Sequence, residues 1–343
     1  MRLGVNIGYV AGAGSPGADE HVQLAVEAER LGYDVCWAAE AYGSDAPTLL
    51  AFVAARTQRM HVGSAIMQIP ARTPAMTAMT AATLDTLSKG RFRLGLGVSG
   101  PQVSEGWHGV SFRRPVTRTR EYVEIVRAAL AREGPLTYEG KEFRLPVEGS
   151  ELGKPLKLLI QPERTEIPVY LGAVGPRAIE QTGEIADGWL PFMFSPEHAE
   201  QMLAPVRASG RSVDVAPVVP VCVAGDEAAA RDLARPWLSI YLGGMGAKDK
   251  NFYVDMAATY GHGESAREVQ DRFLGGDRDG AAAALSDELI DSSAICTTAA
   301  KLDDRLADYD RAGADTLLAI PFGDRPAIVR ALGAVDAVKP AAS

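Results

Sequence analysis

One pattern governs the first part of this sequence: a short apolar run followed by a stretch in which apolar residues recur every three or four positions. Four such runs occur, at residues 3–9, 33–39, 60–67 and 92–98, and a helical stretch follows each of them. Short apolar runs bounded by turn residues are typical of buried strands, and the longer spacing is typical of helices. Alternating strands and helices indicate a parallel sheet with helices packed on it.

Capping residues place the boundaries of the helices. For the first helix, Asp19 is the expected N-cap and Gly32 the stop. The third helix is the most clearly defined, because Thr73 can cap it, Pro74 suits its first position and Gly90 ends it. Its predicted packing face consists of Met76, Met79, Thr80, Thr83, Leu84 and Leu87.

The second half of the chain continues the pattern with two interruptions. Strands are expected at residues 169–173, 188–192, 218–223 and 315–320. Residues 135–166 are predicted to form an insertion with a hairpin, and residues 242–290 a largely helical one. Eight strand–helix units in 343 residues favour a single-domain (β/α)₈ TIM barrel over residues 1–343. An open doubly wound sheet uses the same repeat and is the alternative.

Composition narrows the class of protein further. The 35 Lys and Arg against 44 Asp and Glu give a net charge of -9, which opposes binding to nucleic acid. Cys36, Cys222 and Cys296 are far apart and odd in number, so we expect neither a disulfide framework nor a CxxC site. No apolar stretch approaches the length of a spanning helix, and no signal peptide is evident. We expect a cytoplasmic protein that does not associate with membranes.

Ligands of such barrels bind at the carboxyl ends of the strands, where this chain is polar and rich in glycine. Glu40 ends the second strand, and Gln68 and Arg72 follow the third. A carboxylate at this position can hydrogen-bond a ring or exchange protons, and a capping or salt-bridged role is the alternative. His108 is a candidate proton donor, although a solitary loop histidine is also typical of a surface residue.

Two glycine-rich turns are candidate anion sites. Residues 95–100 follow the fourth strand and match G-x-G-x-x-G, in which glycines let backbone N–H groups approach a phosphate. Residues 172–176 follow the fifth strand and open a helix. Either turn could instead be purely structural. No metal-ligand set and no nucleophile elbow is present, so we expect no metal site and infer that a cofactor supplies the chemistry.

Three segments together resemble a known family. They are residues 38–45, 68–76 and 95–102, and residues 186–191 and 302–318 extend the match over nearly the whole chain. The chain resembles the luciferase-like monooxygenase superfamily, and within it the oxidoreductases that use the deazaflavin coenzyme F420. The resemblance implies a TIM barrel with a non-prolyl cis peptide, at Ala65–Ile66 here, behind the deazaflavin ring. It also implies hydride transfer and, commonly, a homodimer.

The resemblance carries over residue by residue to a candidate site. Glu40 and His108 are the catalytic candidates. The cofactor-binding candidates are Glu40, Ala65, Ile66, Gln68, Thr73, Gly97, Val98, Ser99, Gly100, Gly172, Gly175 and Pro176. The candidate contacts to a small-molecule substrate are Tyr9, Tyr42, Trp107, Phe192 and Phe194.

Departures from the family leave the substrate open. The sugar-phosphate dehydrogenases carry Asp-His where Glu40-Ala41 stands here, and their acidic residue after the strand-four glycines is Pro101 or Gln102 in this chain. A sugar phosphate is therefore disfavoured as the substrate, and a pterin or another conjugated acceptor remains a candidate. Two alternatives to the F420-dependent oxidoreductase are an FMN-dependent monooxygenase and a non-catalytic flavin-binding barrel.

Overall fold

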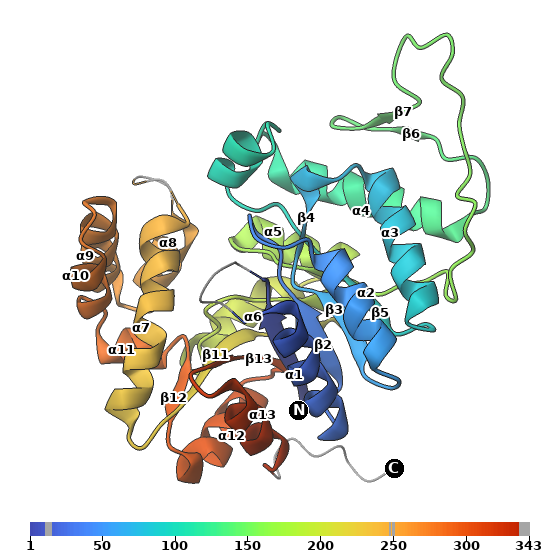
Figure 1. Ribbon diagram of the computed structural model, residues 1–343. Coiled ribbons are helices and arrows are strands. Elements are labelled where there is room, and N and C mark those ends of the chain that lie inside the picture. The colour runs from blue at the N-terminus through green and yellow to red at the C-terminus, as the bar shows by residue number, and fades with distance from the viewer. Residues whose placement is uncertain (11–15, 247, 249–250, 336–343) are drawn as a thin grey trace.

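The protein is a barrel of parallel strands surrounded by helices (Figure 1), seen in a computed structural model that describes residues 1–10, 16–246, 248 and 251–335. The barrel strands in chain order are β1 (Arg2–Gly8), β2 (Val35–Ala38), β3 (His61–Ser64) with β4 (Met67–Gln68), β5 (Phe92–Gly97), β8 (Val169–Leu171), β9 (Gly188–Trp189), β10 (Asp214–Val215) with β11 (Val218–Val223), and β13 (Thr316–Phe322).

Backbone hydrogen bonds close the sheet into a ring. Neighbouring strands follow the chain order from β1 to β9, and β1 pairs with β13 in parallel. The remaining gap is bridged by the segment that holds β10 and β11. On one side the Val218 N–H donates to the carbonyl of Pro191 at 2.9 Å, and on the other the Leu318 N–H donates to that of Pro217 at 2.9 Å. The predicted TIM barrel is therefore confirmed, and the open doubly wound sheet is excluded.

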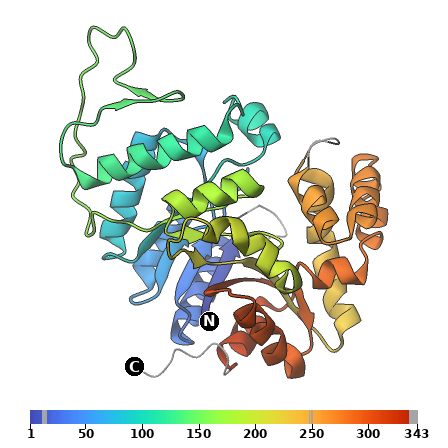
Figure 2. The ribbon, with the colours of Figure 1, turned by 180° about the vertical axis from the view of Figure 1, so that it is seen from behind.

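Helices cover the outside of the ring, as the view from behind also shows (Figure 2). The helices after successive strands are α1 (Ala18–Arg30), α2 (Ala46–Arg56), α3 (Pro74–Leu87), α4 (Pro115–Ala131), α5 (Pro176–Ile185), α6 (Ala199–Arg207), α7 (Glu227–Gly244), α12 (Leu302–Arg311) and α13 (Arg325–Gly333). Short helical turns are η1 (Ile69–Ala71), the π-helix η2 (Gln102–Trp107), η3 (Pro196–His198) and η4 (Ala299–Lys301).

Two segments of the chain add structure outside the ring of strands. Residues 135–166 hold the short hairpin β6 (Tyr138–Glu139) and β7 (Arg144–Leu145), on an arm that projects from the barrel (Figure 1). After α7 come α8 (Phe252–Thr259), α9 (Gly263–Leu274), α10 (Arg278–Ala283), α11 (Asp287–Asp291) and β12 (Ile295–Thr297). These helices pack with α7 around a small core of their own beside the barrel.

Three local predictions need correction. The N-cap of α1 is Gly17, and Asp19 lies inside the first turn. The apolar run at residues 60–67 contributes to two strands, β3 and β4, with the cis Ala65–Ile66 peptide between them. The third correction concerns α3, where Thr73 does cap the helix by accepting from the Met76 N–H, but the buried face is not the predicted one.

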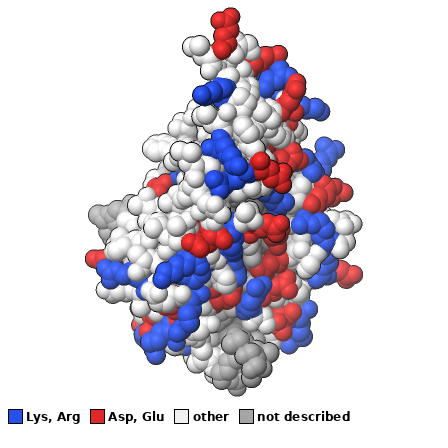
Figure 3. Space-filling view, turned by 90° about the vertical axis from the view of Figure 1, so that its right-hand side faces the viewer, with Lys and Arg blue, Asp and Glu red and all other residues white. Residues whose placement is uncertain are grey.

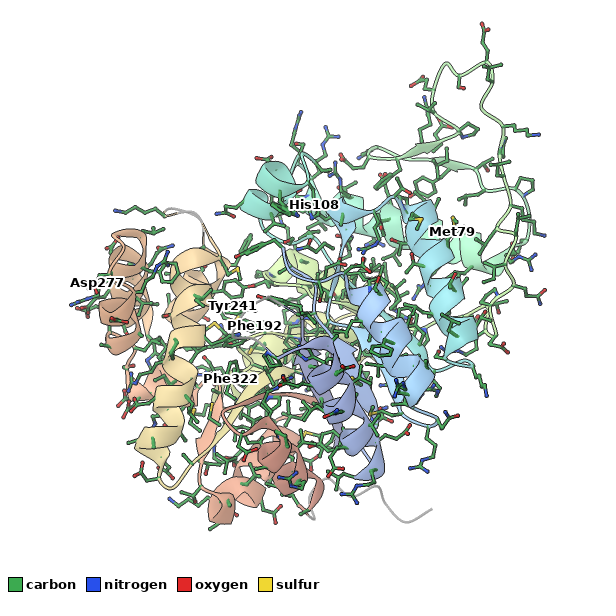
Figure 4. The ribbon with its side chains drawn as sticks, viewed as in Figure 1. Met79, His108, Phe192, Tyr241, Asp277 and Phe322 are labelled. Carbon is green, nitrogen blue, oxygen red and sulfur yellow. The ribbon has the colours of Figure 1, made fainter. Side chains whose placement is uncertain are left out.

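Helix α3 packs on the barrel through small side chains. Its buried positions are Pro74, Thr77, Ala78, Ala81, Ala82, Leu84 and Asp85. Of the predicted face only Leu84 is buried, whereas Met76, Met79 and Leu87 are 49%, 48% and 55% exposed. Small residues let the helix approach the sheet closely, so the alanine face is buried and the larger apolar residues face outward, as Met79 does in Figure 4.

Among the described residues, no helix is long and apolar enough to cross a membrane. All three cysteines are buried and free. One side of the molecule, shown in Figure 3, carries basic and acidic side chains intermingled, without a continuous basic surface.

Candidate cofactor and substrate cavity

A cavity of about 930 Å³ opens at the carboxyl ends of the barrel strands. The ends of β1, β5 and β8 contribute to its base, and α7 and α8 form one of its sides. Its volume lies at the upper end of the range for sites that take drug-sized ligands or cofactors. The position is where enzymes of this fold bind their substrates.

The floor of the cavity is built around Ile66. The Ala65–Ile66 peptide is cis, as the family resemblance implied, and both residues line the cavity. Gly97 and Gly172 lie against it, and a Cβ built on them would come to 2.9 Å from Ile66 Cδ1 and 3.1 Å from Ile66 Cγ2, respectively. Only glycine therefore leaves the Ile66 side chain and the floor in their observed positions.

The two glycine-rich turns border this floor. Residues 97–100 line the cavity, with Ser99 in a left-handed conformation at φ 59°. Gly175, at φ 87°, is the N-cap of α5, and Pro176 and Arg177 follow it. The unpaired backbone N–H groups of a helix N-terminus and a guanidinium favour an anion. Among the described residues that line the cavity, Arg177 alone is charged.

Glu40 lies behind the cavity and does not line it. Its side chain is 7% exposed, and its two oxygens accept from both terminal nitrogens of Arg72 at 2.7 and 2.8 Å. The backbone N–H groups of Gln68 and Ala46 donate to the same carboxylate at 3.0 and 3.2 Å. Four donors thus occupy it, which gives Glu40 a positioning role between the loops after β2 and β4.

Gln68 continues this network to the turn after β5. Its side chain accepts from His108 Nε2 at 2.8 Å and donates to the Ser99 hydroxyl at 3.2 Å. With this orientation of the amide, the imidazole proton lies on Nε2, because the Gln68 oxygen can only accept. Glu40, Gln68 and His108 are therefore brought together, and of this network only Ser99 reaches the cavity.

An aromatic wall on the side of α7 and α8 completes the cavity. It consists of Phe192, Trp237, Tyr241 and Tyr253. Figure 4 labels Phe192 and Tyr241. Phe192 stacks on Tyr241 with ring centroids 4.3 Å apart, and Trp237 lies 4.4 Å from Tyr241. Tyr253 meets Tyr241 edge-on at 5.3 Å. Offset and edge-on contacts of this kind stabilise aromatic clusters, so the rings are held in fixed positions.

Of the four residues of this wall, only Phe192 was predicted from the sequence. Trp237 and Tyr241 are one helical turn apart, so they project from the same face of α7, and this spacing was the available signal. Nothing in the sequence indicated that the face turns toward the barrel.

The other expected site residues divide into two groups. Those that line the cavity are Tyr9, Tyr42, Ala65, Ile66, Gly97, Val98, Ser99, Gly100, Trp107, Gly172, Gly175, Pro176 and Phe192. Thr73 lies at the start of α3, outside this lining. Phe194 is withdrawn as a substrate contact, because its side chain is fully enclosed in the barrel core, with its ring 6.2 Å from that of Tyr309.

The ionisable groups of the wall are uncharged near neutral pH. Burial raises the pKa of Tyr253 to about 12 and raises that of Tyr241 as well, to which the neighbouring phenols of Tyr253, Tyr9 and Tyr42 add. Burial also raises the pKa of Tyr9. These hydroxyls therefore remain hydrogen-bond donors.

Fold and cavity define a TIM-barrel protein with a cofactor-sized site that combines a glycine-lined floor, an anion-favouring helix end and an aromatic wall. The luciferase-like monooxygenase family matches residues 1–316, and the chain belongs to this family.

Individual relatives narrow the comparison. A protein of Mycobacterium tuberculosis, provisionally named a coenzyme F420-dependent oxidoreductase, is 42% identical over 94% of this chain and 95% of its own length. The 5,10-methylenetetrahydromethanopterin reductase of Archaeoglobus fulgidus is 28% identical over 89% of this chain and 91% of its own. The structure of the coenzyme F420-dependent tetrahydromethanopterin reductase of Methanopyrus kandleri has a TM-score of 0.82 at 22% identity, covering 97% of each chain.

Proposed function

We propose that this protein is a coenzyme F420-dependent oxidoreductase that transfers a hydride between the deazaflavin and a small organic substrate. The observation that carries the proposal is the cavity floor, where Ile66 lies against Gly97 and Gly172 and a Cβ built on either glycine would come closer to it than van der Waals contact. The F420-dependent name of the Mycobacterium tuberculosis relative supports the same conclusion.

The residues present suit such a cofactor. Ala65 and Ile66 would support one face of its ring. The turn at residues 97–100 and the start of α5, with Arg177, would hold its anionic part. When bound, the deazaflavin supplies a ring carbon that gives or takes a hydride. The chain positions the ring against the substrate and keeps water out.

Glu40 and His108 enter this proposal as positioning residues. Glu40 fixes Arg72 and the Gln68 backbone, while the Gln68 side chain holds Ser99 and His108 on one side of the cavity. The carboxylate of Glu40 has no oxygen left for a substrate proton.

Gly97→Val tests the cofactor site directly. The added side chain would meet Ile66 within 2.9 Å and fill the floor, so binding of F420, followed by quenching of its fluorescence, is expected to weaken at least 100-fold. Gly134→Val is the matched control, because a Cβ there meets nothing within 4 Å. Unchanged affinity in Gly97→Val would remove the floor from the site.

We also propose a cytoplasmic homodimer. Three free buried cysteines suit a reducing compartment. The outward apolar residues of α3, Met76, Met79 and Leu87, offer a surface for a second copy. Sedimentation analysis is expected to give twice the mass of one chain. The Met79→Lys substitution is expected to lower the measured mass toward that of the monomer. A monomeric wild type would refute the assembly.

A further inference from the structure

The hydroxyl groups of the ten tyrosines fall into two sets and one single case. Five tyrosines donate to a described protein atom away from the cavity: Tyr33, Tyr122, Tyr138, Tyr170 and Tyr260. Four others, Tyr9, Tyr42, Tyr241 and Tyr253, line the cavity, and no hydrogen bond joins their hydroxyls to a described residue. Tyr309 is buried in the core, and its hydroxyl is also unpaired.

Phenolic hydroxyls enclosed in a protein usually have a partner, because leaving one unpaired is unfavourable. Tyr42 is 60% exposed, so its hydroxyl meets solvent. For the half-buried Tyr9, Tyr241 and Tyr253, no described residue supplies the partner, and a water molecule or a bound ligand can supply it. Tyr241 is the central member of the set, because its ring contacts those of Phe192, Trp237 and Tyr253. Tyr9, Tyr42, Tyr241 and Tyr253 thus all belong to the lining of one cavity.

The same region discriminates against charge. Among the described lining residues there is no Asp, Glu, Lys or His, and Arg177 belongs to the α5 end of the cavity. A charged substrate portion against the aromatic wall would lose its hydration without gaining a counter-ion. Aromatic rings in offset contact present flat apolar faces, which suit a flat ring.

We infer that the aromatic wall binds the substrate as an uncharged, flat, ring-containing carbonyl compound that accepts the hydride, or as the corresponding alcohol that donates it, with its oxygen hydrogen-bonded by the Tyr241 hydroxyl. This inference rests on the proposed function for the reaction, but concerns a binding site that does not need the reaction for its test. Sugar phosphates and carboxylates are excluded from this wall by the same reasoning.

The test compares two probes of nearly equal shape, the ketone 1-tetralone and the hydrocarbon tetralin, titrated against the full chain by ligand-observed NMR. One neutral hydrogen bond is worth about 0.5–1.5 kcal/mol, or roughly 2- to 12-fold in affinity. Tyr241→Phe removes the hydroxyl and keeps the ring. We expect this substitution to lower the affinity for 1-tetralone by this factor and to change the affinity for tetralin less than 2-fold.

Tyr309→Phe is the matched control, because it also removes an unpaired hydroxyl but lies outside the cavity lining. It is expected to leave both affinities unchanged. Equal losses for the two probes, an unchanged affinity for 1-tetralone, or tighter binding of the anionic probe 1-naphthoate than of 1-tetralone would each overturn the inference. So would a wild-type chain that binds neither neutral probe.

A separate titration of the Tyr241→Phe protein with F420 shows whether the substrate inference or the proposed function has failed. If F420 binds normally while the probes show no dependence on Tyr241, the substrate inference is wrong and the cofactor assignment stands. If the probes behave as expected and F420 does not bind, the wall is a binding site and the proposed function is wrong.

Discussion

Glu40→Gln separates a positioning carboxylate from one that exchanges protons. Glutamine has the same shape but replaces one carboxylate oxygen by an NH₂ group. Whichever oxygen is replaced, that NH₂ faces one Arg72 nitrogen and one backbone N–H, either of Gln68 or of Ala46. One hydrogen bond from the charged Arg72 and one from a neutral backbone N–H are then lost at a largely buried position.

The expected cost follows from these two contacts. Losing the charged contact costs about 1.5–3 kcal/mol, and a stranded neutral donor about 1–3 kcal/mol. Arg72 retains Asp45 as a second partner, so the lower part of the sum, about 3 kcal/mol, is expected. Urea unfolding followed by circular dichroism would show a fall in midpoint of about 1 M at an m-value near 3 kcal/mol/M.

The matched control is Glu197→Gln at an exposed glutamate, which is expected to change the midpoint little. A Glu40→Gln protein as stable as the wild type, with F420 binding intact and turnover abolished, would refute the positioning role. That result would return Glu40 to the proton-exchanging role considered from the sequence.

Two further predictions concern the fold. Burial lowers the pKa of His21 from its usual 6.5 to about 4, and the nearby Arg325 guanidinium adds to this effect. Between these two pH values the unfolded chain binds more protons than the folded chain, so the folded state loses stability as the pH falls from about 6.5 to 4. Urea midpoints measured across this range should fall less steeply in His21→Asn than in the wild type, and equal slopes would contradict this. Gly95→Ala would place a Cβ 1.7 Å from the Ser64 carbonyl oxygen inside the barrel, so we expect loss of folded protein, and a normal melting temperature would contradict the register of β3 and β5.

The eight barrel strands could be predicted because each is a buried apolar run between turn residues. Which face of each helix is buried was harder to predict from the sequence. Helix α3 has apolar residues on two faces, and spacing alone does not reveal that Ala78, Ala81 and Ala82 pack on the barrel while Met76 and Met79 face outward. Close approach of helix to sheet decides this, and it depends on residues far away in the chain.

The candidate site shows the same division. Its glycine turns and Ile66 lie at strand ends, so strand prediction and family resemblance together locate them. The aromatic wall depends on how α7 and α8 fold back over the barrel, which no local pattern encodes. The surroundings of Glu40 were also hidden, because its partners Arg72 and Gln68 come from a different loop.

The most direct test of the account is a titration of the purified protein with oxidised coenzyme F420 and, separately, with FMN, followed by fluorescence quenching. The account predicts saturable F420 binding at one site per chain, and much weaker binding of FMN. Tight FMN binding with no binding of F420 would contradict it, and would favour an FMN-dependent monooxygenase in the same cavity.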